Sequence, residues 1–223
     1  MENNKGDFVM EKQENNHLFF KVMNYLTDTA ILSILWLIGS LPILTIGAST
    51  TALFYVSGKK VGGKDYRIVA DFFKSYKQNF FQSIGITILL GVMWFSSVTY
   101  FMMGYVPLNE GLSLSIVVII LVAFEVTMLS IYMCALLAKY ELKTITLIKN
   151  SFLFTHAYFK ESIQAFGVVV MMLFCLLIVP GLIILLPGTI ALTASYFVRN
   201  SIMKFVKRQE ILKALREEQT LDF

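Results

Sequence analysis

The chain has 223 residues, of which 57% are hydrophobic and only 15% are charged, and its formal net charge is +4. About a quarter of the residues in a soluble domain are charged, so this composition excludes an ordinary soluble domain and predicts an integral membrane protein. Since about 20 apolar residues cross a bilayer core, the length accommodates several crossings.

The first 21 residues are polar and mix acidic with basic side chains. They lack the short apolar core followed by a small-residue cleavage site that marks a secretory signal peptide. We therefore expect residues 1–21 to form a polar cytoplasmic segment and the first apolar helix to be retained.

The 19 Lys and Arg residues fall into four clusters separated by three long gaps. Short loops rich in Lys and Arg stay on the cytoplasmic side of a membrane. Placing every cluster on that side requires an even number of crossings in each gap, and both termini are then cytoplasmic. The gaps are residues 22–58, 78–138 and 161–198.

This distribution predicts an all-α polytopic membrane bundle of six transmembrane helices in three hairpins. The predicted outer turns all contain proline, a residue typical of turns; they are Pro42, Gly104–Gly111 and Val179–Gly188. The six predicted spans are residues 22–41, 43–58, 82–103, 113–137, 164–179 and 186–203, within one membrane domain over residues 22–206.

The second span is short. Residues 43–58 rise about 24 Å as a helix, less than the hydrocarbon core of about 30 Å. If residues 42–58 only re-enter the membrane, the chain has five spans and the N-terminus lies outside.

Three basic segments outside the long spans carry apolar residues at helical spacing, which is typical of interfacial amphipathic helices. We expect these helices to lie against the anionic inner leaflet. The alternative is that they dock a cytoplasmic partner. We expect no binding of nucleic acid. Two of them end in a Phe-x-x-Ser-Ile repeat, at Phe80–Ile84 and Phe159–Ile163. The segments are residues 64–84, 146–163 and the C-terminal helix 207–223.

Two stretches, "LPILTIGASTTALFYV" and "YRIVADFFKSYKQNFFQS", resemble the YesL family of small integral membrane proteins of Gram-positive bacteria. The resemblance implies a plasma-membrane location and, by family association, a gene found near those of carbohydrate ABC transporters and sugar-utilisation systems. It implies no catalytic residues. The matching positions are Pro42, Thr45, Gly47, Thr51, Ala52 and Tyr55 in the first stretch, and Phe72, Phe73, Lys74, Asn79 and Phe80 in the second.

The segment Gly58–Asp65 has the glycine and lysine spacing of a phosphate-binding loop. That motif requires Ser or Thr after its lysine to coordinate magnesium, and it follows a β-strand. Here Asp65 takes that position after a membrane helix, so we interpret the segment as a flexible basic loop.

No residue pattern indicates an enzyme. His17 and His156 lack neighbours at metal-ligand spacing, and no nucleophile stands beside a base. Cys134 and Cys175 lie within apolar runs. We expect no catalytic residues, no cofactor and no metal site.

Two acids within the predicted spans are the polar candidates, because an ionised carboxylate is costly in the bilayer. Neither Asp28 nor Glu125 has a cation in its own span. We expect Glu125 to be hydrogen-bonded to a hydroxyl such as Thr87, Ser96 or Thr99 as a link between helices. The alternative role is a proton or cation relay.

These patterns together predict a non-enzymatic integral membrane protein that acts as an accessory or regulatory component. The family resemblance alone implies the plasma membrane as its location and an association with carbohydrate transport. The alternative is a small-solute transporter or channel that uses Glu125. The expected partners are the lipid bilayer and, through the resemblance, a carbohydrate ABC transporter or sensor, while the oligomeric state stays open.

Overall fold

The computed structural model describes residues 3–103 and 114–221, with the side chains of residues 20, 22–99, 117–179, 181, 182 and 184–213. Within these ranges every element is a helix, which confirms the predicted all-α class. In chain order the elements are α1 (Asn3–Gly39), η1 (Ile43–Thr45), α2 (Ile46–Val61), α3 (Ile68–Gln78), α4 (Phe80–Met103), α5 (Leu114–Lys139), α6 (Thr144–Ala157), α7 (Phe159–Ile178), η2 (Pro180–Ile184) and α8 (Leu186–Leu221).

Four helices are long and apolar enough to cross a membrane within the described part of the chain. Their apolar stretches lie in α1, α4, α5 and α7. The two other predicted spans, 43–58 and 186–203, fall on α2 and α8, which are not among these four. The four stretches are Val22–Gly39, Phe80–Thr99, Val117–Lys139 and Phe159–Ile178.

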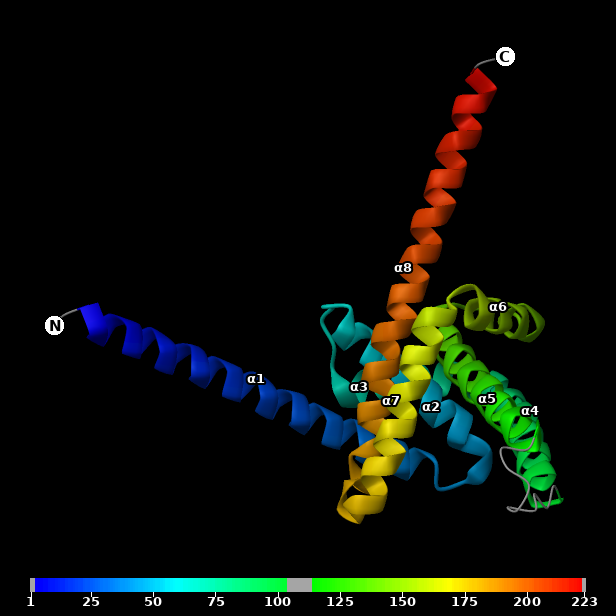
Figure 1. The fold of residues 1–223 in the computed structure, drawn as a ribbon, viewed down its shortest axis with the longest axis horizontal. Helices are drawn as coiled ribbons and strands as arrows, with labels where there is room; N and C mark the ends of the chain where they lie inside the picture. The colour runs from blue at the N-terminus through cyan, green and yellow to red at the C-terminus, as the bar shows by residue number, and fades with distance from the viewer. Residues whose placement is uncertain (1–2, 104–113, 222–223) are drawn as a thin grey trace.

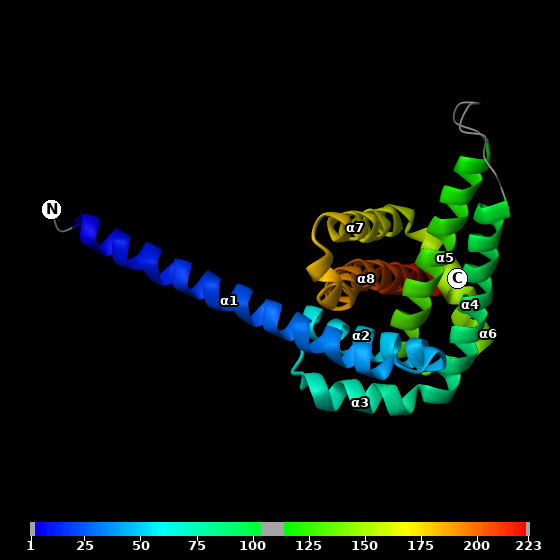
Figure 2. The ribbon, with the colours of Figure 1, turned by 90° about the horizontal axis from the view of Figure 1, so that it is seen from below.

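The short helix α2 lies at the centre of the fold (Figures 1 and 2) and packs against α1, α3, α4, α5 and α8. Its buried positions include small residues, which allow neighbouring helices to approach closely. Ala48 and Ala52 have no exposed surface, and Gly47 and Ser49 are also buried. Small side chains therefore explain why this helix is the one that others surround.

The turn between α1 and α2 is held by hydroxyl groups. The predicted first span, 22–41, ends slightly early, because α1 stops at Gly39 before the turn at Pro42. The Thr45 hydroxyl donates to the carbonyl oxygens of Gly39 at 2.7 Å and Pro42 at 2.6 Å. The Trp36 indole donates to Thr50 Oγ1 at 3.0 Å, which ties the two helices together beyond the turn.

The N-terminal part of α1 and the C-terminal part of α8 project away from the packed helices (Figure 1). From Asn3 onward the predicted polar segment 1–21 belongs to the same continuous helix as the first apolar stretch. The predicted C-terminal helix 207–223 is likewise the end of α8 rather than a separate element, as far as Leu221.

The Phe-x-x-Ser-Ile repeat marks two similar units. In each one a short helix ends at a single non-helical residue, Asn79 or Tyr158, and a long apolar helix starts at the following Phe. The predicted helices over 64–84 and 146–163 are therefore wrong in extent, because the chain leaves the helical conformation at Asn79 in the first and at Tyr158 in the second. The Asn79 side-chain amide donates to the Ser75 carbonyl oxygen at 3.1 Å and occupies the end of α3.

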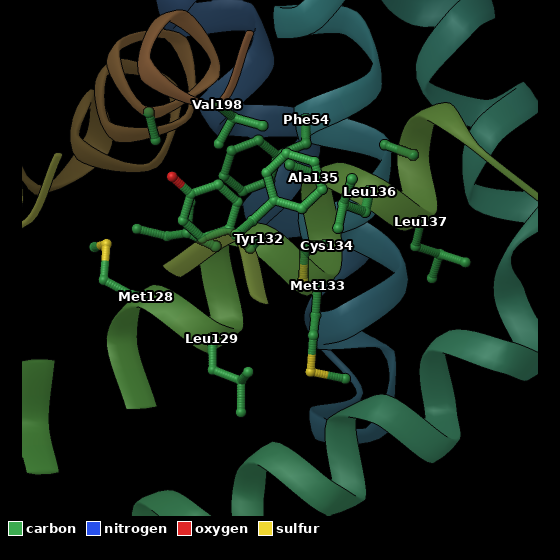
Figure 3. Close-up of a cluster of buried hydrophobic side chains, with 14 of the residues drawn as sticks. Phe54, Met128, Leu129, Tyr132, Met133, Cys134, Ala135, Leu136, Leu137 and Val198 are labelled. Atoms are coloured by element: carbon green, nitrogen blue, oxygen red, sulfur yellow. The ribbon is translucent and has the colours of Figure 1, made fainter. Parts of the chain in front are cut away.

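The main hydrophobic core surrounds α5 (Figure 3). Phe54 of α2 and Val198 of α8 lie against the buried Tyr132 and its neighbours on α5. The Tyr132 hydroxyl is 3.2 Å from Ser162 Oγ on α7 and 3.1 Å from Ser201 Oγ on α8. This hydroxyl contact joins three helices within an otherwise apolar centre.

A second core joins α1, α2, α3 and α8 around Leu32, Val56 and Phe72. Next to it the predicted turn Val179–Gly188 contains η2 and brings Gly188 against α1. The Gly188 amide donates to Ser33 Oγ at 2.9 Å, and a Cβ at this position would lie 2.5 Å from the Thr29 carbonyl oxygen. The predicted loop Gly104–Gly111 lies outside the described residues.

Candidate functional site

Asp28 is held by partners that the sequence does not place beside it. Its Oδ2 accepts hydrogen bonds from Lys60 Nζ at 2.7 Å and from the Tyr66 hydroxyl at 2.6 Å. The Lys60 ammonium also lies 4.4 Å from the centre of the Tyr25 ring. Burial and the neighbouring Asp28 carboxylate raise the pKa of Tyr66 to about 12, so the phenol stays a hydrogen-bond donor at neutral pH. Asp28 therefore links α1 to Lys60 at the end of α2 and to Tyr66 in the loop that follows.

Glu125 meets a histidine rather than one of the predicted hydroxyls. Its Oε2 lies 3.6 Å from Nε2 of His156, at the end of α6. The expected partner Thr87 instead donates to the Ser83 carbonyl oxygen at 2.8 Å. Glu125 Oε1 is buried and has no hydrogen-bond partner among the described residues. The acid in α5 is thus only partly satisfied.

A third acid, Glu161, lies at the start of α7 and was not among the predicted candidates. It is buried and forms an ion pair with Lys204 of α8. The sequence could have indicated Glu161 through its position in the first turn of an apolar helix, where a carboxylate complements the helix dipole. This ion pair joins α7 to α8.

The first family-motif stretch builds the turn and the central helix. Thr45 caps the turn after Pro42, and Gly47 donates its amide to Thr87 Oγ1 at 3.0 Å. A Cβ on Gly47 would lie 2.8 Å from the Ser83 carbonyl oxygen. The other three positions, Thr51, Ala52 and Tyr55, lie on α2, with the first two fully buried in the core.

The second family-motif stretch forms α3 and packs it against α2. Phe72 has no exposed surface and packs against α2, whereas Phe73 is 43% exposed and Lys74 is also exposed. Asn79 ends α3, and the Phe80 ring that follows lies 5.7 Å from the Tyr76 ring. Most positions of both stretches therefore shape the packing of α2, α3 and α4 and do not converge on a common pocket.

A cleft of about 300 Å³ lies where the C-terminal ends of α2 and α5 meet the middle of α8. Its apolar side consists of buried residues of all three helices, while its polar side is basic and, among the residues that the structure describes, contains no Asp or Glu. The apolar lining comes from Phe54, Ala135, Ala138, Val198 and Ile202, and the polar lining from Lys59, Lys64, Lys139, Ser195 and Arg199, with Tyr55, Gly58 and Gly62 between them.

The four cations of the cleft have different surroundings. Lys59 Nζ lies 2.8 Å from Asp71 Oδ1, and this hydrogen bond raises the pKa of Lys59. Arg199 donates through one guanidinium nitrogen to the Val61 carbonyl oxygen, and the Lys139 ammonium lies 5.3 Å from the centre of the Tyr140 ring. Among the ion pairs of the described residues, only that of Lys59 involves a cation of the cleft.

Sequence analysis missed this convergence although its signals were present. Lys59, Lys139 and Arg199 are the first basic residues after the three apolar gaps, and all three line the same cleft. The segment Gly58–Asp65, predicted to be a flexible basic loop, is helical as far as Val61, where α2 ends. It contributes one wall of the cleft through Gly58, Lys59, Gly62 and Lys64. Gly63 has a φ of +65°, a conformation that glycine adopts without strain, so the chain can turn sharply after α2.

The described residues contain no group of three His, Cys, Asp or Glu side chains that could hold a metal ion. Cys134 and Cys175 are free, with Cys134 buried in the main core. The basic cleft is therefore the feature with the clearest chemistry for a ligand.

Residues 29–101 match the model of a protein family described as "Protein of unknown function, DUF624". The match runs from the middle of α1 through α2 and α3 into α4 and includes every family-motif position. This part of the chain therefore resembles an uncharacterised domain family. Neither the curated proteins nor the solved structures yielded a match.

Proposed function

We propose that the protein is a non-enzymatic accessory or regulatory component of a plasma-membrane assembly. The observation that supports this proposal is the pairing of Asp28 with Lys60 and Tyr66 at 2.7 Å and 2.6 Å. An acid that lies within an apolar helix and is held by two partners serves the fold, since its charge is already compensated. The resemblance to the YesL family points to a carbohydrate ABC transporter or its sensor as the partner.

The proposed topology has six spans and cytoplasmic termini. Three packed helix pairs, α1 with α2, α4 with α5 and α7 with α8, support a hairpin arrangement. The short α2 keeps the five-span alternative open. A cysteine introduced at Asn15 distinguishes the two topologies: an impermeant thiol reagent leaves it unlabelled in intact cells for six spans and labels it for five.

Co-purification tests the accessory role. The full chain is extracted in a mild detergent, and the proteins bound to it are identified by mass spectrometry. We expect a transporter or sensor to co-purify in stoichiometric amount. The control variant Phe95→Leu, on the exposed face of α4, should retain the same partner. Extraction of the chain alone under several mild conditions would contradict the proposal.

The second candidate function is a small-solute transporter, and the Glu125–His156 contact at 3.6 Å favours it. A carboxylate with one unpartnered oxygen beside a histidine can exchange a proton within the membrane. Reconstituted in liposomes, such a transporter moves solute without a partner and loses that activity in Glu125→Gln. A purely structural Glu125 tolerates Gln, because the amide keeps the shape and polarity of the side chain beside His156, and loses assembly in Glu125→Leu.

A further inference from the structure

The basic cleft between α2, α5 and α8 combines the two surfaces that an anionic amphiphile needs. Its lining pairs the cationic groups of Lys59, Lys64, Lys139 and Arg199 with a buried apolar wall. Arg and Lys are the side chains that bind phosphate oxygens, Arg through parallel hydrogen bonds and Lys as a point charge. The apolar wall suits the start of an acyl chain.

The charge of the cleft is left largely uncompensated. Asp71 pairs with Lys59, and none of the described residues that line the cleft is acidic. The Val61 carbonyl accepts from one nitrogen of Arg199, and the guanidinium has five N–H donors in all. Donors and positive charge therefore remain on the cleft side for an anion.

A buried hydroxyl supplies an independent sign of a ligand. Ser195 lines the cleft, is 5% exposed, and its Oγ has no hydrogen-bond partner among the described residues. A buried hydroxyl without a partner is costly. A phosphate oxygen in the cleft would accept its hydrogen bond.

We propose that this cleft binds the phosphate group of an anionic amphiphile, with a phospholipid headgroup of the surrounding bilayer as its source. Basic pockets between membrane helices are the sites where acidic lipid headgroups bind. The ends of α2 and α5, whose first basic residues line the cleft, place it at the boundary between apolar helix and polar loop. Binding here needs no partner protein, so its failure and the failure of the accessory role are separate results.

Gly58 allows the cleft to be blocked without a change of charge. It lines the cleft, lies within α2, and a Cβ added to it meets no atom within 4 Å. Gly58→Leu therefore fills space in the cleft without a clash in the backbone. Because Gly is a poor helix former, this substitution also favours α2, so a loss of binding would not reflect unfolding.

The experiment measures lipid retention by the full chain. The protein is purified in a neutral detergent and incorporated into phosphatidylcholine nanodiscs with or without phosphatidylglycerol. Native mass spectrometry then counts the lipids that stay bound to the protein after it is released from the nanodiscs. We expect preferential retention of phosphatidylglycerol, reduced roughly tenfold in Lys139→Gln because one charge-assisted contact is lost. Gly58→Leu gives a similar reduction, Ser195→Ala a smaller one, and the exposed Lys149→Gln, on α6, retains lipid like the unmodified chain.

A second arm distinguishes the source of the phosphate. Inorganic phosphate and glycerol phosphate are titrated against the detergent-solubilised chain, with thermal unfolding as the readout. Stabilisation by these soluble anions that Gly58→Leu abolishes, without preferential lipid retention, would keep the phosphate site and move its source to solution. Retention and stabilisation that are equal in the unmodified chain, Lys139→Gln and Gly58→Leu would overturn the site, provided that circular dichroism shows all three folded.

Discussion

Helices α2 and α4 differ in how much of their surface is buried within the protein. In α2, the shorter helix, Ala48, Ala52 and Val56 have no exposed surface. In α4, Phe81 is 87% exposed and Phe95 is 74% exposed, although the helix is long enough to span a membrane. The more apolar helix is thus the one that faces outward, and the less apolar helix is the one inside.

The difference follows from the solvent. Lipid tails are as apolar as Leu, so burial inside the protein gives no hydrophobic gain there and close packing selects small residues. In this pair the more apolar helix faces lipid, while small residues of α2 such as Gly47, Ala48 and Ala52 mark helix contacts. Substitutions on the two helices are expected to differ accordingly.

The largest difference is expected between two glycines. Gly47→Ala places a methyl group 2.8 Å from the Ser83 carbonyl oxygen and closer still to the Thr87 hydroxyl, and overpacking of this kind costs about 3 kcal/mol. Gly91→Ala on α4 meets no atom within 4 Å and stabilises the helix by up to about 1 kcal/mol. Thermal unfolding in detergent, followed by circular dichroism, measures both, and equal effects would show that α2 is not closely packed.

The next effect concerns the ion pair at the end of α2. Lys60→Met leaves Asp28 without its cation and is expected to cost about 2 kcal/mol, since both side chains are mostly buried. The double variant with Asp28→Asn recovers part of that loss because no charge is left unpaired. The exposed Lys77→Met is the control. Unfolding by a denaturing detergent measures the three variants, and a double variant less stable than Lys60→Met would argue against the pairing.

A smaller effect depends on pH at the junction of α2 and α3. Burial alone would raise the pKa of Asp71, but hydrogen bonds from Lys59 and from the Arg67 amide outweigh it and lower the pKa. The stability from this carboxylate is therefore present above the ordinary Asp pKa of about 3.9 and is lost as the pH falls through the lowered value. Asp71→Asn should lower stability at neutral pH and match the unmodified chain at low pH, where the carboxyl group is protonated, so the acid side of the stability profile becomes flatter. An equal loss of stability at all pH values would contradict this role.

The smallest effect is expected on the outer face of α4. Phe95→Leu exchanges one lipid-facing apolar side chain for another and should change stability by less than about 0.5 kcal/mol. The matched Phe54→Leu in the core of α2, where the ring is 6% exposed, should cost about 1 kcal/mol. Thermal unfolding of the two variants measures their losses of stability. Equal losses would show that the outer face of α4 is covered by protein and does not face lipid.

Sequence analysis located most of the helices but not all of their ends. It placed turns at Pro42 and in the segment Val179–Gly188, because proline and the change of hydropathy are local signals. It missed the break at Asn79, where the apolar pattern continues across the non-helical residue and the side-chain amide donates to the Ser75 carbonyl oxygen. The motif residues were found as a set, yet the close packing of Gly47 and Phe72 depends on neighbours from other helices.

The all-α class and the membrane character were determined by the sequence alone, because apolar content and the spacing of basic residues are properties of each segment by itself. Only the tertiary structure decided the partners of Asp28 and Glu125 and brought Lys59, Lys139 and Arg199 to one cleft beside Ser195. These contacts join distant parts of the chain, and they depend on how each helix is rotated and inclined against the next. No local pattern specifies those angles; they follow from the packing of small residues around α2.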